Sequence, residues 1–293
     1  MTNPPSRSST DDLRKSTDPE DPFAAYDAAS PGAEPQTGRH QTRSGSNTTR
    51  RCLGIRLWSD TMETAVETLL AAAHQGETGY GCFANAHMVG ESRVNKDLAR
   101  AMRQATWVFP DGKPVAMMLR MRGASEAAQI PGPETTERLL DVAAASGLPV
   151  YLFGGAESVL ADLQERLPRR FLGLRIAGAH SPPFRAWTPE EQLADAERIR
   201  ASGARVCFVA LGCPKQETWM HRNAAATGCI CLGVGAAFPM LAGLTPRAPA
   251  WVRRVGMEWA YRWLQEPRRL ARRYTVGNAR FFWAAQREFR TRR

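Results

Sequence analysis

Short apolar runs of the strand type alternate with longer helical patterns from residue 61 to residue 234. No other feature constrains the fold as much, because this alternation is typical of a parallel sheet covered by helices on both faces. We therefore expect an α/β fold with a mostly parallel sheet. The predicted strands cover residues 81–84, 107–109, 150–153, 174–177, 206–211 and 229–234, and the predicted helices cover residues 61–75, 92–104, 113–121, 133–146, 157–167, 189–201 and 215–226.

Composition and charge divide the chain into three parts. Residues 1–50 are rich in Ser, Thr and Pro and show no sustained periodicity, so we expect this segment to be disordered. Residues 51–244 form the predicted α/β core. Residues 245–293 contain thirteen arginines, three glutamates and no lysine, which equals the whole net charge of +10. This last part is predicted to be a basic amphipathic helical appendage.

The appendage is expected to contain two helices, over residues 252–265 and about 268–289, separated at Glu266-Pro267. On a helical wheel of the second helix, arginines gather on one side and apolar residues on the other. This pattern suits a helix that lies in a membrane interface, although a solvated basic face on a helix packed against the core is the alternative. The arginines are Arg269, Arg273, Arg280 and Arg287, and the apolar residues are Leu270, Ala271, Tyr274, Phe281, Phe282, Ala285 and Phe289.

Several patterns indicate the compartment. Residues 1–50 lack an apolar stretch of the signal-peptide type, so we expect a cytoplasmic protein. The uncharged run 223–246 contains four glycines and two prolines, which favours a strand, a turn and a short helix over a membrane span. The six cysteines include no C-x-x-C pair and are expected to be reduced and structural.

Asp111 is the first candidate for chemistry. It follows the predicted strand 107–109 and precedes Gly112, at the edge where open α/β sheets bind ligands. An Asp-Gly pair at such a position fits a turn or a helix cap. It also fits a general base that takes a proton from a hydroxyl nucleophile.

Glycine turns follow two of the predicted strands, at Gly154-Gly155 and at Gly233-Val234-Gly235. Such turns let backbone amides approach a phosphate, and the next helix N-terminus favours its negative charge. Neither turn completes G-x-G-x-x-G, so a close-packed turn explains them equally well.

The stretch L-G-C-P-K-Q-E at residues 211–217 brings a strand, a turn at Gly212 and a helix start to the same edge. Pro214 and Glu217 suit a helix N-terminus on structural grounds alone. Lys215 and Gln216 are not needed for capping, so they are the better candidates for ligand contact, and Glu217 is a further candidate.

The sequence offers little for a metal. His87 follows Asn85 at a predicted strand end, but no H-E-x-x-H pattern is present and no two aspartates stand two residues apart. The D-x-D pattern with which many sugar transferases hold a metal–diphosphate complex is therefore absent. We expect neither a metal nor a cofactor, and a nucleotide diphosphate would be neutralised by arginines and backbone amides.

Taken together, these motifs resemble the WecG/TagA/CpsF glycosyltransferases, glycosyltransferase family 26. The resemblance runs in order from about residue 52 to residue 275, and its most specific parts are P-K-Q-E and the pair E-W-x-x-R and E-P-x-R. The matching stretches are N-A-H at 85–87, P-D-G at 110–112, F-G-G at 153–155, G-C-P-K-Q-E at 212–217, R-A-P at 247–249, E-W-A-Y-R at 258–262 and E-P-R-R-L-A-R-R-Y at 266–274.

The resemblance implies a Rossmann-like core and an inverting, metal-independent transfer. The implied donor is a UDP-sugar of the hexose or N-acetylhexosamine type, and the implied acceptor is a sugar linked to a polyprenyl diphosphate, as in the synthesis of bacterial exopolysaccharide and other surface glycans. It implies that Asp111 is the base and that Asn85 and Gln216 lie near the donor sugar. It also implies that the tail arginines Arg262, Arg269 and Arg272 close the site and bind the diphosphate.

Four positions depart from the family pattern around the donor. Phe83 replaces a threonine that is common in the family, and Gln129 replaces a common arginine. Glu134 stands in place of the usual aspartate, and Pro239 stands where the family often has F-D. The donor sugar is therefore the least specified feature. The F-A-N-A-H and D-G-x-P variants are similar to members that use UDP-glucose, which favours glucose.

Two other classes remain as alternatives. A nucleic-acid-binding α/β protein would explain the basic tail, but the apolar residues interleaved with the arginines suit lipid better. A nucleotide-dependent oxidoreductase would need a complete G-x-G-x-x-G. The expected partners are thus the UDP-sugar, the lipid-linked acceptor and the inner face of the cytoplasmic membrane, with no nucleic acid and with a homo-oligomer as a further possibility.

Overall fold

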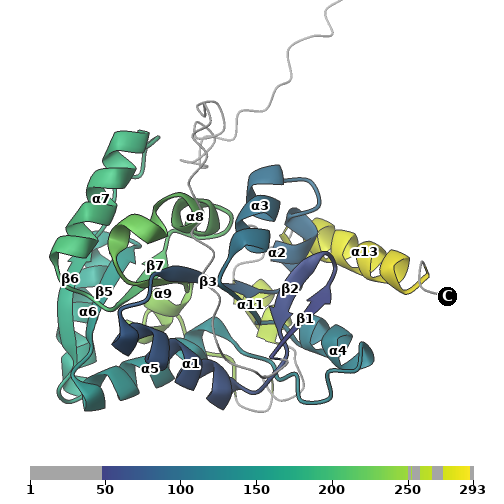
Figure 1. Cartoon of the computed structure of the whole chain (residues 1–293), viewed down its shortest axis with the longest axis horizontal. Helices are drawn as coiled ribbons and strands as arrows, with labels where there is room; N and C mark the ends of the chain where they lie inside the picture. Colours follow the sequence, from purple (N-terminus) through teal and green to yellow (C-terminus); the bar gives the residue numbers. More distant parts are fainter. Residues whose placement is uncertain (1–47, 250–251, 253–257, 266–272, 291–293) are drawn as a thin grey trace, which may run out of the picture.

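A six-stranded parallel sheet forms the centre of the molecule in the computed structural model, which describes residues 48–249, 252, 258–265 and 273–290 (Figure 1). All neighbouring strands in this sheet run parallel. The strands are β3 (Gly79–Ala84), β4 (Trp107–Pro110), β5 (Pro149–Gly154), β6 (Arg175–His180), β7 (Val206–Ala210) and β8 (Ile230–Gly233), in the spatial order β4-β3-β8-β7-β5-β6. The predicted α/β class is confirmed, and each predicted strand is present.

Two helical layers cover the sheet because successive strand side chains point to opposite faces. Tyr151 and Phe153 of β5 belong to one apolar core, whereas Val150 and Leu152 belong to the other. The first core is covered by α2 (Ala86–Glu91), α3 (Lys96–Gln104), α4 (Lys113–Met121), α7 (Pro189–Ala201), α8 (Lys215–Thr227) and α13 (Asn278–Arg290), and the second by α1 (Met62–Gln75), α5 (Gly132–Ser146), α6 (Glu157–Arg170) and α9 (Ala237–Leu241).

Two elements differ from the sequence expectation because of local backbone chemistry. The helix expected at 92–104 is α3, which begins at Lys96, and the unpredicted helix α2 precedes it. Asn85 and Asn95 each cap one of these helices by accepting a backbone N–H, from Met88 at 3.0 Å and from Leu98 at 2.9 Å. An unpredicted antiparallel hairpin, β1 (Thr49–Cys52) and β2 (Ile55–Trp58), precedes the sheet. Its turn residues Leu53 and Gly54 both have positive φ, as a type I′ turn requires, but Leu is not a typical signal for that turn.

The tail packs against the core through its last helix. The described part of the tail contains α11 (Glu258–Gln265) and a π-helical turn, η2 (Arg273–Gly277), which continues into α13. Phe281 is 1% exposed and Ala285 is buried, so these two members of the expected membrane-facing arc contact the protein instead. A Cβ on Gly90 of α2 would collide with the carbonyl oxygen of Gly277, so the glycine lets the tail approach closely.

The outward side of α13 carries Phe282 and Trp283, which are 58% and 63% exposed. Several expectations concern residues outside the described ranges. These are the disorder of residues 1–47, the break at Glu266-Pro267, and the placement of Leu270 and Ala271. The side chains of Tyr274 and Phe289 also lie outside the described part. In the described part of the chain no helix is both long and apolar enough to cross a membrane. All six cysteines are free, as expected.

Candidate functional site

The carboxyl ends of the strands meet at one edge of the sheet, because the strands are parallel. At this edge β5 continues into α6, which covers one face, whereas the adjacent β7 continues into α8, which covers the other. Connections that diverge in this way leave a crevice between the two strand ends. The crevice is where an open α/β sheet binds its ligand.

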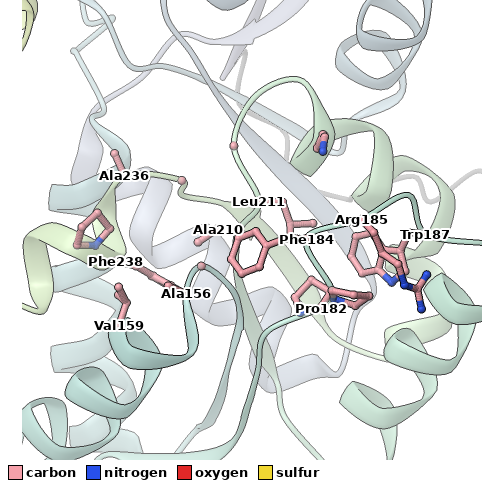
Figure 2. Close-up of a pocket in the computed structure, with 16 residues that line it drawn as sticks. Ala156, Val159, Pro182, Phe184, Arg185, Trp187, Ala210, Leu211, Ala236 and Phe238 are labelled. Carbon is pink, nitrogen blue, oxygen red and sulfur yellow. The ribbon is translucent and has the colours of Figure 1, made fainter. Parts of the chain in front are cut away.

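A cavity of about 440 Å³ lies in this crevice (Figure 2). Its lining combines three glycine turns, aromatic side chains and two cations. Figure 2 shows Phe238 on one side of the cavity and Phe184 and Trp187 on the other. The lining includes Gly155, Gly212, Gly235, Phe184, Trp187, Phe238, Arg185 and Lys215.

Four of the predicted binding residues line the cavity, namely Gly155, Gly212, Lys215 and Gly235. The three glycines have φ values of +79°, +79° and +47°, in the left-handed region where L side chains are strained. They bring the main chain to the rim at three places without a covering side chain. Four residues that the sequence pattern assigned to the ligand edge therefore border one cavity, whereas its aromatic wall was not predicted.

The other residues predicted at these turns do not line the cavity but lie buried beneath it, where they hold the turns together. Gln216 is only 4% exposed, and its side chain accepts the Gly212 N–H at 3.1 Å and donates to the Gly233 carbonyl at 2.9 Å and to Glu217 at 2.7 Å. A Cβ on Gly154 would lie 2.9 Å from the Ala210 carbonyl. These groups join the turns after β7, β8 and β5 into one framework.

The aromatic wall comes from the loop between β6 and α7, which sequence reasoning missed. Trp187 donates through Nε1 to Asp195 Oδ2 at 3.1 Å and stacks on Phe153 with ring centroids 5.9 Å apart. Asp195 also accepts from His180 at 3.1 Å. Burial lowers the pKa of His180, although the Asp195 carboxylate acts in the opposite direction. The loop has no periodicity and no motif, so the sequence did not predict that it lines the site.

The two cations of the cavity differ in their surroundings. Arg185 binds Glu191 through two hydrogen bonds, of 2.6 and 2.9 Å. The hydrogen bond from this guanidinium lowers the pKa of the Glu191 carboxyl to about 2. Lys215 begins α8, directly after the Gly212 turn, so its charge adds to the positive end of the helix dipole.

Asp111 forms a second group with Asn85, at the ends of β4 and β3. Asn85 donates to Asp111 Oδ2 at 3.3 Å, and the Gly132 N–H at the start of α5 donates to Oδ1 at 3.2 Å. Gln129 donates to the Asp111 carbonyl at 2.7 Å, so the residue that replaces the common arginine holds this turn. The half-buried carboxylate is thus oriented by Asn85 and by the Gly132 N–H, while Gln129 holds the main chain of Asp111.

Asp111 does not line the cavity, but it lies at the same edge. Neighbouring strands are roughly 4.8 Å apart, so the end of β4 is roughly 10 Å from the end of β8, where Gly235 borders the cavity. Asp111 thus lies two strand positions from the border of the cavity at Gly235.

The remaining predicted residues belong to the tail or touch it. A Cβ on Gly277 would collide with His87 Nδ1, so η2 covers His87. The backbone of Arg262 lies in α11, but its side chain, like Arg269 and Arg272 as a whole, lies outside the described residues. In the described ranges no group of three or more His, Cys, Asp or Glu side chains could hold a metal ion.

Comparison with protein families gives a match over most of the chain. Residues 50–293 match the family model described as "Glycosyl transferase WecG/TagA/CpsF family". The matched range begins in β1 and extends through α13. It therefore includes the whole parallel sheet, the cavity, the Asp111 turn and the tail.

Proposed function

Because the chain belongs to the WecG/TagA/CpsF family of glycosyltransferases, we propose that it transfers a hexose or N-acetylhexosamine from a UDP-sugar to a polyprenyl-diphosphate-linked acceptor. One observation carries this proposal. A cavity with a mixed aromatic and cationic lining opens at the same sheet edge as the Asp111 carboxylate, which Asn85 and the Gly132 N–H orient. In the proposal, the nucleotide donor occupies the cavity and the acceptor hydroxyl lies at the carboxylate, in a reaction of bacterial surface-glycan synthesis.

The cavity is the proposed donor site. Its volume of about 440 Å³ lies within the range of about 300–1,000 Å³ typical of small-molecule sites. The aromatic side chains Phe184 and Trp187 offer apolar surface for the uracil ring. The glycine turns at Gly155 and Gly212, together with Lys215, offer backbone amides and a positive charge for the diphosphate.

The proposed chemistry is an inverting displacement with Asp111 as the base. The acceptor hydroxyl oxygen attacks the anomeric carbon from the side opposite UDP while Asp111 takes the hydroxyl proton. The bond from the anomeric carbon to the diphosphate oxygen breaks, and its electron pair leaves with UDP. Asn85 keeps the carboxylate aimed, since it is itself fixed as the N-cap of α2.

The charge of the departing diphosphate is assigned to protein groups rather than to a metal. Lys215 and the dipole of α8 act at the cavity. The tail arginines Arg262, Arg269 and Arg272 complete this role in the proposal, because bidentate guanidinium groups suit phosphate oxygens. The proposed reaction therefore proceeds without an added divalent cation.

The tail is proposed to hold the enzyme at the inner face of the cytoplasmic membrane. The outward face of α13 carries Phe282 and Trp283 next to Arg287 and Arg290. The Arg287 guanidinium lies 5.7 Å from the centre of the Trp283 ring. Aromatic rings beside arginines suit the boundary between lipid headgroups and acyl chains. Phe281, on the opposite face, anchors the helix to the core.

Replacing Phe184 by Ala should weaken UDP binding about tenfold to a hundredfold. The ring is 55% exposed at the cavity, and stacking of a base on an aromatic side chain contributes roughly 1–3 kcal/mol. Isothermal titration calorimetry with UDP measures the change. Leu172→Ala is the matched control, because Leu172 is 84% exposed and does not line the cavity. An unchanged dissociation constant in the Phe184 variant would place the uracil ring elsewhere.

A further inference from the structure

Three arginines line a second depression, of about 470 Å³, between the β1–β2 hairpin and the end of α3. Arg51 and Arg56 come from the two strands of the hairpin, and Arg103 comes from the last turn of α3. Thr49 and Gly54 complete the lining, so no carboxylate contributes to it. The depression therefore concentrates three positive charges without an opposite charge in its wall.

The hairpin places two of these charges against each other. Arg51 and Arg56 are register partners in the antiparallel pair β1–β2, so their side chains leave the hairpin on the same face. Like charges directly opposite on neighbouring strands destabilise a sheet. A hairpin selected for stability alone would carry an opposite charge or an uncharged residue at one of these positions.

The neighbouring arginines have structural roles, because each binds a group of another element. Arg93 donates to the Leu53 carbonyl at 2.8 Å, Arg122 pairs with Glu288 at 3.3 Å, and Arg280 pairs with Glu91 at 3.3 Å. Each of these joins two elements. The side chains of the three arginines in the depression make no hydrogen bond or ion pair with any residue in the described ranges.

We propose that this depression, formed by Arg51, Arg56 and Arg103, is a binding site for a phosphate group. Planar guanidinium groups present paired N–H donors that match phosphate oxygens. A bound phosphate would also offset the repulsion between Arg51 and Arg56. The site is separate from the donor cavity, because the two linings share no residue.

The phosphate has two possible sources. The hairpin turn touches the tail, since the Leu53 N–H donates to Glu288 of α13 at 2.6 Å, and Figure 1 shows the hairpin beside α13. If α13 contacts a membrane, as proposed above, headgroups of anionic lipids come close to the depression. A soluble phosphate or phosphate ester is the other source, and it does not depend on membrane contact.

The triple variant Arg51→Gln/Arg56→Gln/Arg103→Gln tests the site in the full chain. The matched control, Arg169→Gln/Arg175→Gln/Arg200→Gln, removes the same charge from exposed arginines of α6, β6 and α7. One arm measures thermal stabilisation by inorganic phosphate. The other measures partition onto phosphatidylglycerol vesicles, with phosphatidylcholine vesicles as the reference. Calorimetry with UDP, which the site variant should bind like the wild type, separates this question from the proposed donor site.

The site variant is expected to lose the response in at least one arm while the control keeps it. A selective loss of phosphate stabilisation identifies a soluble ligand. A selective loss of vesicle binding, roughly a hundredfold at roughly 1 kcal/mol for each arginine, identifies a lipid headgroup. Without ligand at low salt, the site variant should melt no lower than the wild type, because the Arg51–Arg56 repulsion is gone. Equal losses in both triple variants, or no loss in either arm, overturn the proposal.

Discussion

Sugar transfer should fall by roughly a thousandfold when Asp111 is replaced by Asn, because general-base catalysis contributes roughly 10²–10⁴-fold. The amide has nearly the shape of the carboxylate and can still accept the Gly132 N–H, but it cannot take the proton of the acceptor hydroxyl. The fold and UDP affinity should therefore be retained. Turnover is measured as UDP release in the presence of acceptor, and affinity by calorimetry.

Asp141→Asn is the control for this experiment. Asp141 is exposed on α5, so the substitution makes the same change of charge away from the strand ends. Its turnover should equal that of the wild type. If the Asp111 variant also turns over at the wild-type rate, the base is another group and the Asp111–Asn85 contact is only structural.

Replacing Phe281 by Ala should lower the free energy of unfolding by about 3–5 kcal/mol, as expected when a buried Phe is truncated in a packed core. The side chain is 1% exposed and belongs to the core beneath α2, α3, α4 and α8. Denaturant titration measures the loss. Phe282→Ala, at the next position and 58% exposed, should change the free energy by less than about 1 kcal/mol. Equal stabilities of the two variants would mean that α13 is not docked as described.

The buried Phe281 also changes how the tail can be tested. Deleting the residues after about 245 removes Phe281 and Ala285 from the core, so lost activity would report on folding as well as on membranes. Substitutions confined to Phe282 and Trp283 leave that contact in place. They are the cleaner variants for separating membrane attachment from catalysis.

The sheet and its candidate ligand edge were predictable because their signals are local. Each buried strand is a short apolar run, and each ends in residues that the turn requires, such as Gly155 and Gly212 with positive φ. In a parallel sheet these ends must meet at one edge, so position along the chain was enough to group Asp111, Asn85 and the glycine turns.

Features that depend on tertiary contacts were not predictable. From the sequence, Gln216 is a polar residue at a helix start. Its side chain is nevertheless buried, because it bonds to Gly212 and Gly233 of two different turns and to the neighbouring Glu217. The helical wheel of α13 shows an apolar arc but not what this arc contacts. The close approach of Gly90 and Gly277 lets Phe281 and Ala285 of the arc pack against the core. The Trp187 loop is fixed by Asp195, eight residues further along the chain, through a contact that no periodicity encodes.

The most direct test of the proposed activity is UDP release by the purified full chain, with EDTA present, from a panel of UDP-sugars and a short-chain lipid-diphosphate sugar. We expect at least one UDP-sugar, with UDP-glucose the first to try, to release UDP only when the acceptor is present. The same reaction should be lost in the Asp111→Asn variant. Acceptor-dependent release that requires a divalent cation, or no release from any UDP-sugar by protein that also fails to bind UDP, would contradict the account.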